Sequence, residues 1–230
     1  MSRVAYINAH LLDPASGLDT LGTLLSESEF VKDFGPELFK DGVPEGVNVV
    51  DCQGFYLIPG LVDMRVQLRE PGEEYKGTLE SEGRTASAGG VTSMVCLPNT
   101  TPVIDDISVL EFVARRARKL GLAKVHSYGA ITKGLEGKEL AEIGLLHKSG
   151  ALAFTDGIKS VSDARIMSQA LSYASNFGQM IIQHAEEPSL ARGGVMNSGE
   201  TATRLGLSGI PRQAEIIMVE RDIHLAEMTG

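Results

Sequence analysis

The sequence lacks the features that mark several protein classes. It has only two cysteines, Cys52 and Cys96, which lie far apart in apolar runs. That placement suits reduced thiols better than a disulfide framework, and it favours the cytoplasm. No apolar run reaches the roughly 18 residues that a membrane span requires, and the first residues contain no signal-peptide core. We therefore expect neither membrane insertion nor export.

Basic segments are also scarce. The chain carries 21 Lys and Arg against 30 Asp and Glu, so that its formal net charge is -9. The one short basic cluster is Arg115, Arg116, Arg118 and Lys119, at the end of a predicted helix, where cations interact favourably with the helix dipole. Nucleic acid is therefore not an expected partner. No G-x-G-x-x-G follows a predicted strand, which disfavours a dinucleotide-binding fold.

Residues 1–55 read as a small β module. Short strands are predicted at Val4–Ile7, Thr23–Leu25 and Val47–Asp51, with glycine and proline between them. These strands are too few to close a stable sandwich by themselves. We therefore expect this module to be one part of a composite β-sandwich.

Residues 56–230 show a different pattern, in which apolar strands alternate with helices. The apolar segments are short, as buried parallel strands are. The predicted strands are Leu61–Leu68, Val91–Leu97, Lys124–Ile131, Ala151–Thr155 and Gln179–Ala185. The alternation predicts an α/β fold with a parallel sheet, either open and doubly wound or closed as an eight-stranded barrel.

The helices between these strands carry start and stop signals. Ser108 with Glu111 predicts a capping box. Pro211 is expected to open the last helix, in which apolar residues recur at helical spacing. Glycines stand where left-handed C-terminal caps are expected. These are Gly89, Gly121, Gly150 and Gly178.

Several motifs in order resemble the dihydroorotase family. The segment PGLVDMRVQLREPG is similar to that family's P-G-x-x-D-x-H-x-H-x-R-x-P-G. The resemblance continues through AITKGLEGKELAEIG, GALAFTDG, IIQHAEEPSL and MNSGETATRLGLSGIP, so that it spans nearly all of residues 52–230. It implies a partial TIM-type (β/α) barrel of the amidohydrolase superfamily with a small N-terminal β-sandwich module. On this interpretation residues 56–230 are the first five β/α units, and the sequence covers the N-terminal half.

The first two metal-ligand positions of the family differ in this sequence. Side chains alternate along a strand, so that Arg65, Gln67 and Arg69 share one face. The resemblance places histidines at positions 65 and 67 in active relatives, as ligands of a first metal ion. A guanidinium has no lone pair to offer a metal, and a neutral amide is a poor substitute for imidazole. We therefore expect the first metal position to be lost.

Other positions of the family's metal site are retained. The resemblance assigns Asp156 as a bridging carboxylate and His184 as a ligand of a second metal, with Lys159 as a weaker alternative to Asp156. A hydrogen-bonded core residue is the alternative interpretation for His184. The expected cofactor is zinc or another divalent ion, with at most one ion bound or none. A further histidine and an aspartate of the family site would lie beyond residue 230, so that this chain holds no complete catalytic site.

Arg69 and Asn99 match the residues that bind the substrate carboxylate in dihydroorotases. A planar guanidinium forms two parallel hydrogen bonds to a carboxylate, which suits Arg69 to that task. The alternatives are an internal salt bridge for Arg69 and a turn cap for Asn99. The sequence does not decide between binding and structural roles.

Three functions remain open. The first is a dihydroorotase that interconverts N-carbamoyl-aspartate and dihydroorotate in pyrimidine biosynthesis. The second is a catalytically inactive scaffold that partners aspartate carbamoyltransferase. The third is a hydantoinase or allantoinase. A homo-oligomer and a small carboxylate ligand are the expected partners. The LREPG and LPNT segments favour the dihydroorotase pattern over the third possibility.

Overall fold

The structure is a computed structural model and describes residues 2–230. It divides into two compact units, Met1–Gly60 and Leu61–Gly230, which we describe separately. The division lies close to the predicted boundary between residues 55 and 56.

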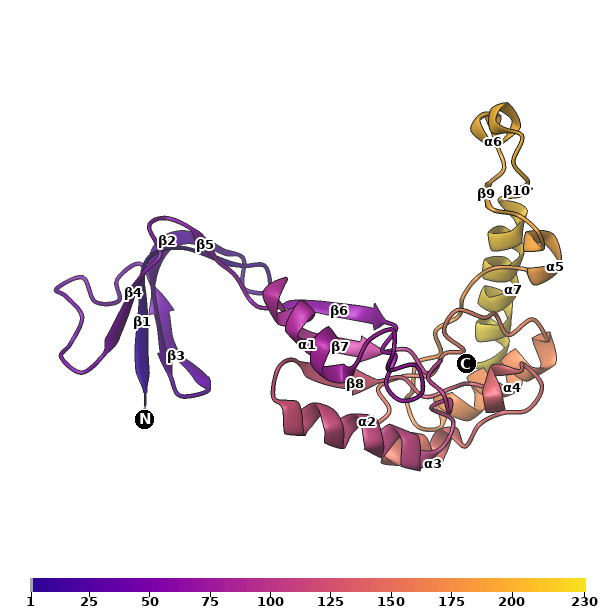
Figure 1. Ribbon diagram of the computed structural model, residues 1–230, viewed down its shortest axis with the longest axis horizontal. Helices are drawn as coiled ribbons and strands as arrows, with labels where there is room; N and C mark the ends of the chain where they lie inside the picture. Colours follow the sequence, from indigo (N-terminus) through magenta and orange to yellow (C-terminus); the bar gives the residue numbers. More distant parts are fainter. Residues whose placement is uncertain (1) are drawn as a thin grey trace. The chain divides into compact units, whose positions relative to one another are not determined.

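The first unit is a single five-stranded sheet (Figure 1). β1 pairs with β2 in antiparallel register, and β2 pairs with β3. The opposite edge of β1 pairs in parallel with β4 and, farther along, with β5. The strands are β1 (Arg3–Asp13), β2 (Leu18–Glu27), β3 (Phe30–Gly35), β4 (Asn48–Asp51) and β5 (Tyr56–Leu57). The described residues of this unit thus supply one layer of the expected sandwich.

The sequence patterns underestimated this sheet. The first two predicted strands are parts of the longer strands β1 and β2, and β3 and β5 were not predicted at all. β3 is exposed over nearly its whole length, and its aromatic residues Phe30 and Phe34 are 74% and 48% exposed. A strand without a buried face does not show the apolar alternation on which the prediction depends.

The second unit is built on a parallel sheet in the order β6-β7-β8 (Figure 1). Its strands are β6 (Leu61–Val66), β7 (Val91–Cys96) and β8 (Lys124–Ser127). Beyond β8 the same order continues as two parallel bridges, from Gly129 to Phe154 and from Phe154 to Ile181. The chain therefore lays down five neighbouring strand positions in sequence order, as one side of a barrel requires.

All five predicted strands are shorter than expected, and two of them are reduced to single bridges. Residues 151–155 and 179–185 form single bridges rather than full strands. Backbone hydrogen bonds still hold their order, because Leu152 donates to the Ser127 carbonyl and Ile182 donates to the Phe154 carbonyl. The apolar pattern therefore located these segments correctly but overestimated the length of their pairing.

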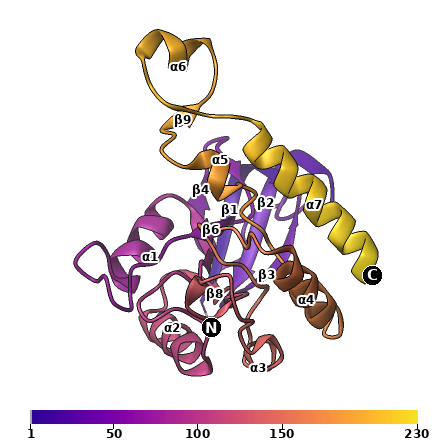
Figure 2. The ribbon, with the colours of Figure 1, turned by 90° about the vertical axis from the view of Figure 1, so that its right-hand side faces the viewer.

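Helices follow the strands along the chain (Figures 1 and 2). α1 and α2 pack on one face of the sheet, where Leu79, Val109 and Val113 join Cys96 in the main core. α7 lies against α4. The helices are α1 (Leu79–Ala88), α2 (Ile107–Leu120), α3 (Ile143–Lys148), α4 (Ala164–Ser175), α5 (Pro188–Ala191), α6 (Glu200–Leu205) and α7 (Gln213–Thr229), with the 3-10 turn η1 (Lys133–Leu135).

The segment before α7 forms a small excursion. β9 (Met196–Asn197) and β10 (Gly209–Ile210) pair in parallel, and α6 projects from them away from the other helices of the unit (Figure 2). α7 then begins at Gln213, two residues after the proline that was expected to open it. None of the helices in residues 2–230 combines the length and the apolar character that crossing a bilayer demands.

Two of the predicted helix caps were wrong. α2 is capped by Asp106 rather than Ser108, because the Asp106 carboxylate accepts the Ser108 amide at 2.8 Å. Aspartate and serine are equally good N-caps, so that the composition of this turn did not distinguish them. Gly121 is left-handed as predicted, with φ 62°. Gly89 is not, and the left-handed residue after α1 is Gly90.

Candidate functional site

The end of β6 contains an irregularity that sets the direction of Arg65. The register between β6 and β7 shifts between Asp63 and Val66, which leaves one extra residue on β6. The Asp63 carboxylate accepts the free Arg65 amide at 3.0 Å, and the Tyr128 hydroxyl donates to the Met64 carbonyl at 2.9 Å. Bulges of this kind re-aim a side chain at the end of a strand. Tyr128 was not identified from the sequence.

Arg65 extends from this bulge toward the fourth strand position. Its Nη2 lies 3.4 Å from the carbonyl oxygen of Gly157, which directly follows Asp156. The neighbouring face of β6 is apolar, since Val66 and Leu68 pack into the core. Met64, which was predicted to share the core face with Val66 and Leu68, is 67% exposed, so that the predicted alternation does not hold across the bulge. The guanidinium contacts the segment in which the family's metal carboxylate is expected.

Gly157 is the meeting point of three segments. It has φ +70°, a conformation that side chains rarely adopt. A Cβ placed there would lie 3.9 Å from the Cβ atoms of Leu97 and Asn99. The structure therefore brings Arg65, Asn99 and the Asp156 segment to Gly157 from the carboxyl ends of β6, of β7 and of the fourth strand position. In α/β barrels this is the end at which ligands bind.

Asp156 is buried and already has hydrogen-bond donors around it. Its Oδ1 accepts the backbone amides of Ile131 and Thr132, both at 2.9 Å. Its Oδ2 accepts the Thr132 hydroxyl at 2.5 Å. Burial raises the pKa of Asp156, and these hydrogen bonds act in the opposite direction. The carboxylate thus ties the fourth strand position to the AITKG segment, and the role of Thr132 was not anticipated.

His184 lies in a separate cavity of about 450 Å³. Lys159 shares this cavity, and its ammonium donates to the Leu135 carbonyl at 3.2 Å. The other residues that line the cavity include Glu136, Lys138 and Glu186. Asp156 does not line it, although the Lys159 amide donates to the Asp156 carbonyl at 3.2 Å.

The residues present do not fit the expected metal centre. Arg65 places a permanent cation at the first ligand position and has no lone pair to donate. Gln67 is half-buried and offers only a neutral amide. The oxygens of Asp156 accept three protein hydrogen bonds. Within residues 2–230, no three His, Cys, Asp or Glu side chains form a group that could hold a metal ion.

Arg69 and Asn99 lie in two loops that pack closely together. The Thr101 amide donates to the Pro71 carbonyl at 3.0 Å, which joins the LREPG loop to the LPNT loop. A Cβ at Gly72 would lie 2.1 Å from the Thr101 carbonyl oxygen, so that only glycine permits this approach.

The two side chains differ in how they are engaged. Arg69 forms an ion pair with Glu73 at 3.0 Å, as its structural alternative predicted. Glu73 also pairs with Lys76, and these contacts lower its pKa. The buried Oδ1 of Asn99 has no hydrogen-bond partner among residues 2–230. Asn99 is therefore the group at this site whose hydrogen-bonding capacity is unused.

The base of the LREPG loop is fixed by a buried carboxylate that the sequence analysis did not single out. Glu70 Oε2 accepts the Leu79 amide at 2.7 Å, at the first residue of α1. Its Oε1 accepts Nε of Arg116, on α2, at 3.1 Å. The basic cluster on α2 thus contains one residue that holds the loop in place. The motif leaves the position of Glu70 open, so that it gave no signal for this role.

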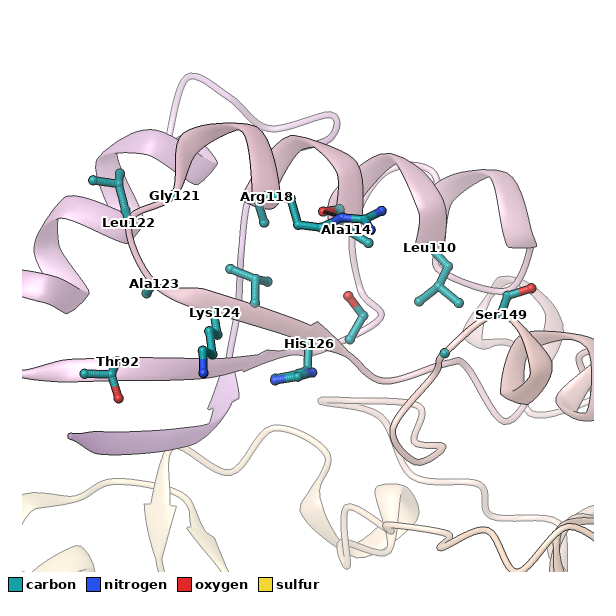
Figure 3. A pocket seen from close by; sticks show the side chains of 14 residues that line it. Thr92, Leu110, Ala114, Arg118, Gly121, Leu122, Ala123, Lys124, His126 and Ser149 are labelled. Atoms are coloured by element: carbon teal, nitrogen blue, oxygen red, sulfur yellow. Dashed lines mark hydrogen bonds between the residues drawn. The ribbon is translucent and has the colours of Figure 1, made fainter. Parts of the chain in front are cut away.

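Another cavity, of about 700 Å³, lies between α2 and β8 (Figure 3). Leu110 and Ala114 face the strand from the helix, whereas Lys124 and His126 point to the other side of the strand. None of the predicted site residues lines this cavity. It runs along the whole of β8 and the turn that precedes this strand.

Comparison with known proteins agrees with the fold and the motifs. The family of dihydro-orotase-like proteins matches residues 54–230. A dihydroorotase of Syntrophobacter fumaroxidans is 46% identical over 224 residues, which are 96% of this chain and 51% of that protein. A dihydroorotase of Wolbachia from Brugia malayi is 44% identical, over 97% of this chain and 50% of its own. The chain thus spans about half the length of these relatives.

Solved structures agree on the architecture. An L-hydantoinase from Arthrobacter aurescens superposes on the whole chain with a TM-score of 0.77, at 20% identity and over 51% of its own length. A D-hydantoinase from Thermus sp. gives a TM-score of 0.71 at 21% identity, over 99% of this chain and 50% of that one. At such identities the likeness concerns the fold alone. The predicted partial TIM-type barrel is confirmed.

Proposed function

Since the chain belongs to the dihydroorotase-like family, we propose that it forms the N-terminal part of a dihydroorotase-like cyclic amidohydrolase. The reaction class would be the reversible closure of N-carbamoyl-aspartate to dihydroorotate, in pyrimidine biosynthesis. The observation that carries the proposal is the packing of the LREPG and LPNT loops, which brings Arg69 and Asn99 to the same end of the barrel.

The contribution of these residues would be to bind and orient the ligand. The side-chain oxygen of Asn99 is buried and has no hydrogen-bond partner among residues 2–230, and such groups orient a ligand by hydrogen bonds. Glu73 pairs with both Arg69 and Lys76. If Arg69 turned to a ligand carboxylate, Glu73 would therefore keep Lys76 as its partner. The hydantoinase or allantoinase alternative is weaker, because it does not account for this loop pair.

Zinc or another divalent ion would be the family's cofactor, and it would polarise the ring amide and activate water. Arg65 and Gln67 do not fit that role, so that we derive no step through a metal. We propose that one ion at most is bound, near His184, or none. His184 and Asp156 remain the tentative ligands, although the hydrogen bonds of Asp156 oppose this assignment.

A second candidate is favoured by the position of Arg65. A guanidinium directed at Gly157 where a metal ligand is expected supports a catalytically inactive, dihydroorotase-like scaffold. Its partner would be aspartate carbamoyltransferase, within a homo-oligomeric assembly in the cytoplasm. Two free cysteines, Cys52 and Cys96, agree with a reducing compartment.

Two measurements on the full-length protein separate these candidates. Metal analysis together with turnover of dihydroorotate tests the enzyme, and a protein that contains no metal and shows no turnover would contradict it. Gel filtration with aspartate carbamoyltransferase tests the scaffold. Failure of the two proteins to elute together would exclude that partner.

A further inference from the structure

The backbone on both sides of Arg65 is held by hydrogen bonds, whereas Arg65 itself is an exposed residue. Its amide is satisfied by Asp63, and the carbonyl of the preceding residue, Met64, accepts the Tyr128 hydroxyl from β8. Tyr128 is itself buried, at 6% exposure, and it packs with Val95 and Leu97. The bulge that aims the guanidinium is therefore fixed from both sides.

The charge of Arg65 is not neutralised within the described chain. Its side chain makes one contact, with the neutral carbonyl of Gly157, and it forms no ion pair with a carboxylate in residues 2–230. The nearest strand-end carboxylate, Asp156, directs its oxygens at Ile131 and Thr132 instead. An arginine has five N–H donors in a fork that matches a carboxylate. Most of these donors remain available.

The surroundings add a second group with unused capacity. Asn99 lies beside Gly157, and its buried Oδ1 has no partner in the described chain. The unpaired guanidinium of the exposed Arg65 and the unsatisfied amide oxygen of Asn99 thus both lie next to Gly157, at the carboxyl ends of neighbouring strands. Such a combination binds a small anionic group with a hydrogen-bonding neighbour, rather than a metal ion.

We propose that Arg65 converts the family's first metal position into a binding site for a carboxylate group of a small ligand. The guanidinium, aimed by the bulge at Met64 and Arg65, would supply positive charge where relatives use a metal ion. Asn99 would form a hydrogen bond to the polar part of the same ligand. This inference rests on the proposed function for the identity of the natural ligand but not for the chemistry of the site.

The test is a set of calorimetric titrations on the full-length protein. The probes are malonate, N-carbamoyl-L-aspartate and L-dihydroorotate, each measured with and without EDTA. Arg65→Gln should raise the Kd of the carboxylate probes about tenfold to a hundredfold, which is the usual contribution of charge-assisted hydrogen bonds. Arg65→Lys should also weaken binding, because an ammonium has no fork. EDTA should change nothing.

Matched variants separate binding from folding. Arg84→Gln removes an exposed guanidinium that pairs only with Glu80 on α1, and it should leave every Kd unchanged. Tyr128→Phe removes the hydroxyl that supports the bulge, and it should weaken binding while circular dichroism reports an intact fold. If Arg65→Gln does not fold, Arg65→Lys decides the question, since it keeps the charge.

The outcomes distinguish this inference from the proposed function. Three results would each overturn the inference. They are equal binding by wild type and by Arg65→Lys or Arg65→Gln, binding that EDTA abolishes, and no binding of any carboxylate probe. If malonate binds through Arg65 whereas N-carbamoyl-L-aspartate and L-dihydroorotate do not bind, the inference stands and the proposed function fails. If N-carbamoyl-L-aspartate binds independently of Arg65, the proposed function stands alone.

Discussion

Removal of the Glu70 carboxylate should destabilise the protein strongly, although Glu70 belongs to no predicted site. Its side chain is only 8% exposed, and it joins the LREPG loop to the first residue of α1 and to Arg116 of α2. Glu70→Ala leaves the buried Leu79 amide without a partner, at a loss of about 1–3 kcal/mol. A carboxylate at a helix N-terminus adds a smaller favourable interaction with the helix dipole.

The ion pair with Arg116 contributes less than a fully buried pair would. Arg116 is 37% exposed, so that water screens its charge once Glu70 is gone. We therefore expect Glu70→Ala to lower the free energy of unfolding by about 2–4 kcal/mol in total. Glu70→Gln should lower it less, because the amide oxygen still accepts the Leu79 N–H. Arg116→Met should also have a smaller effect than Glu70→Ala.

Urea unfolding followed by circular dichroism measures these changes, with the slope m compared between variants. The double variant Glu70→Ala/Arg116→Met should lose less than the sum of the single variants, because the two residues share one interaction. Glu80→Ala is the matched control, since Glu80 pairs with Arg84 on the exposed side of the same helix. A loss below about 0.5 kcal/mol for Glu70→Ala, or strict additivity in the double variant, would refute the reasoning.

Three further predictions concern the packed interior. Thr132→Val should lower the free energy of unfolding by about 2–3 kcal/mol, because Asp156 loses a hydrogen-bond donor and the Gly137 amide loses its acceptor. Urea unfolding measures this loss, and an unchanged urea midpoint would contradict the prediction. Burial raises the pKa of the Cys96 thiol to about 12, so that at pH 8 almost no thiolate is present. Iodoacetamide at pH 8 should therefore label Cys52 in the folded protein and Cys96 only after unfolding, as mass spectrometry would report. Labelling of Cys96 in the folded protein would show that this thiol is not buried. Gly129→Ala should destabilise the barrel unit by about 1–3 kcal/mol, because the added Cβ would lie 2.7 Å from the Phe154 ring, and a thermal midpoint equal to that of wild type would disprove this packing.

The sequence by itself determined the architecture of the second unit. Apolar strands that alternate with amphipathic helices left two topologies, an open doubly wound sheet and a closed barrel, and the sequential order of β6-β7-β8, Phe154 and Ile181 is that of a barrel. The loss of the first metal position is also a prediction from the sequence, since the resemblance places histidines where Arg65 and Gln67 stand. These conclusions depend only on neighbours within a few residues.

Only the tertiary structure decided how the site residues are engaged. Thr132 is 24 residues from Asp156, and Gly157 is 92 residues from Arg65, so that no local pattern could show that they meet. Hydrogen bonds between such distant segments exist because the barrel gathers the carboxyl ends of its strands at one end. The same physical reason explains why Glu70, which the motif alone made unremarkable, proved to hold the loop that carries Arg69.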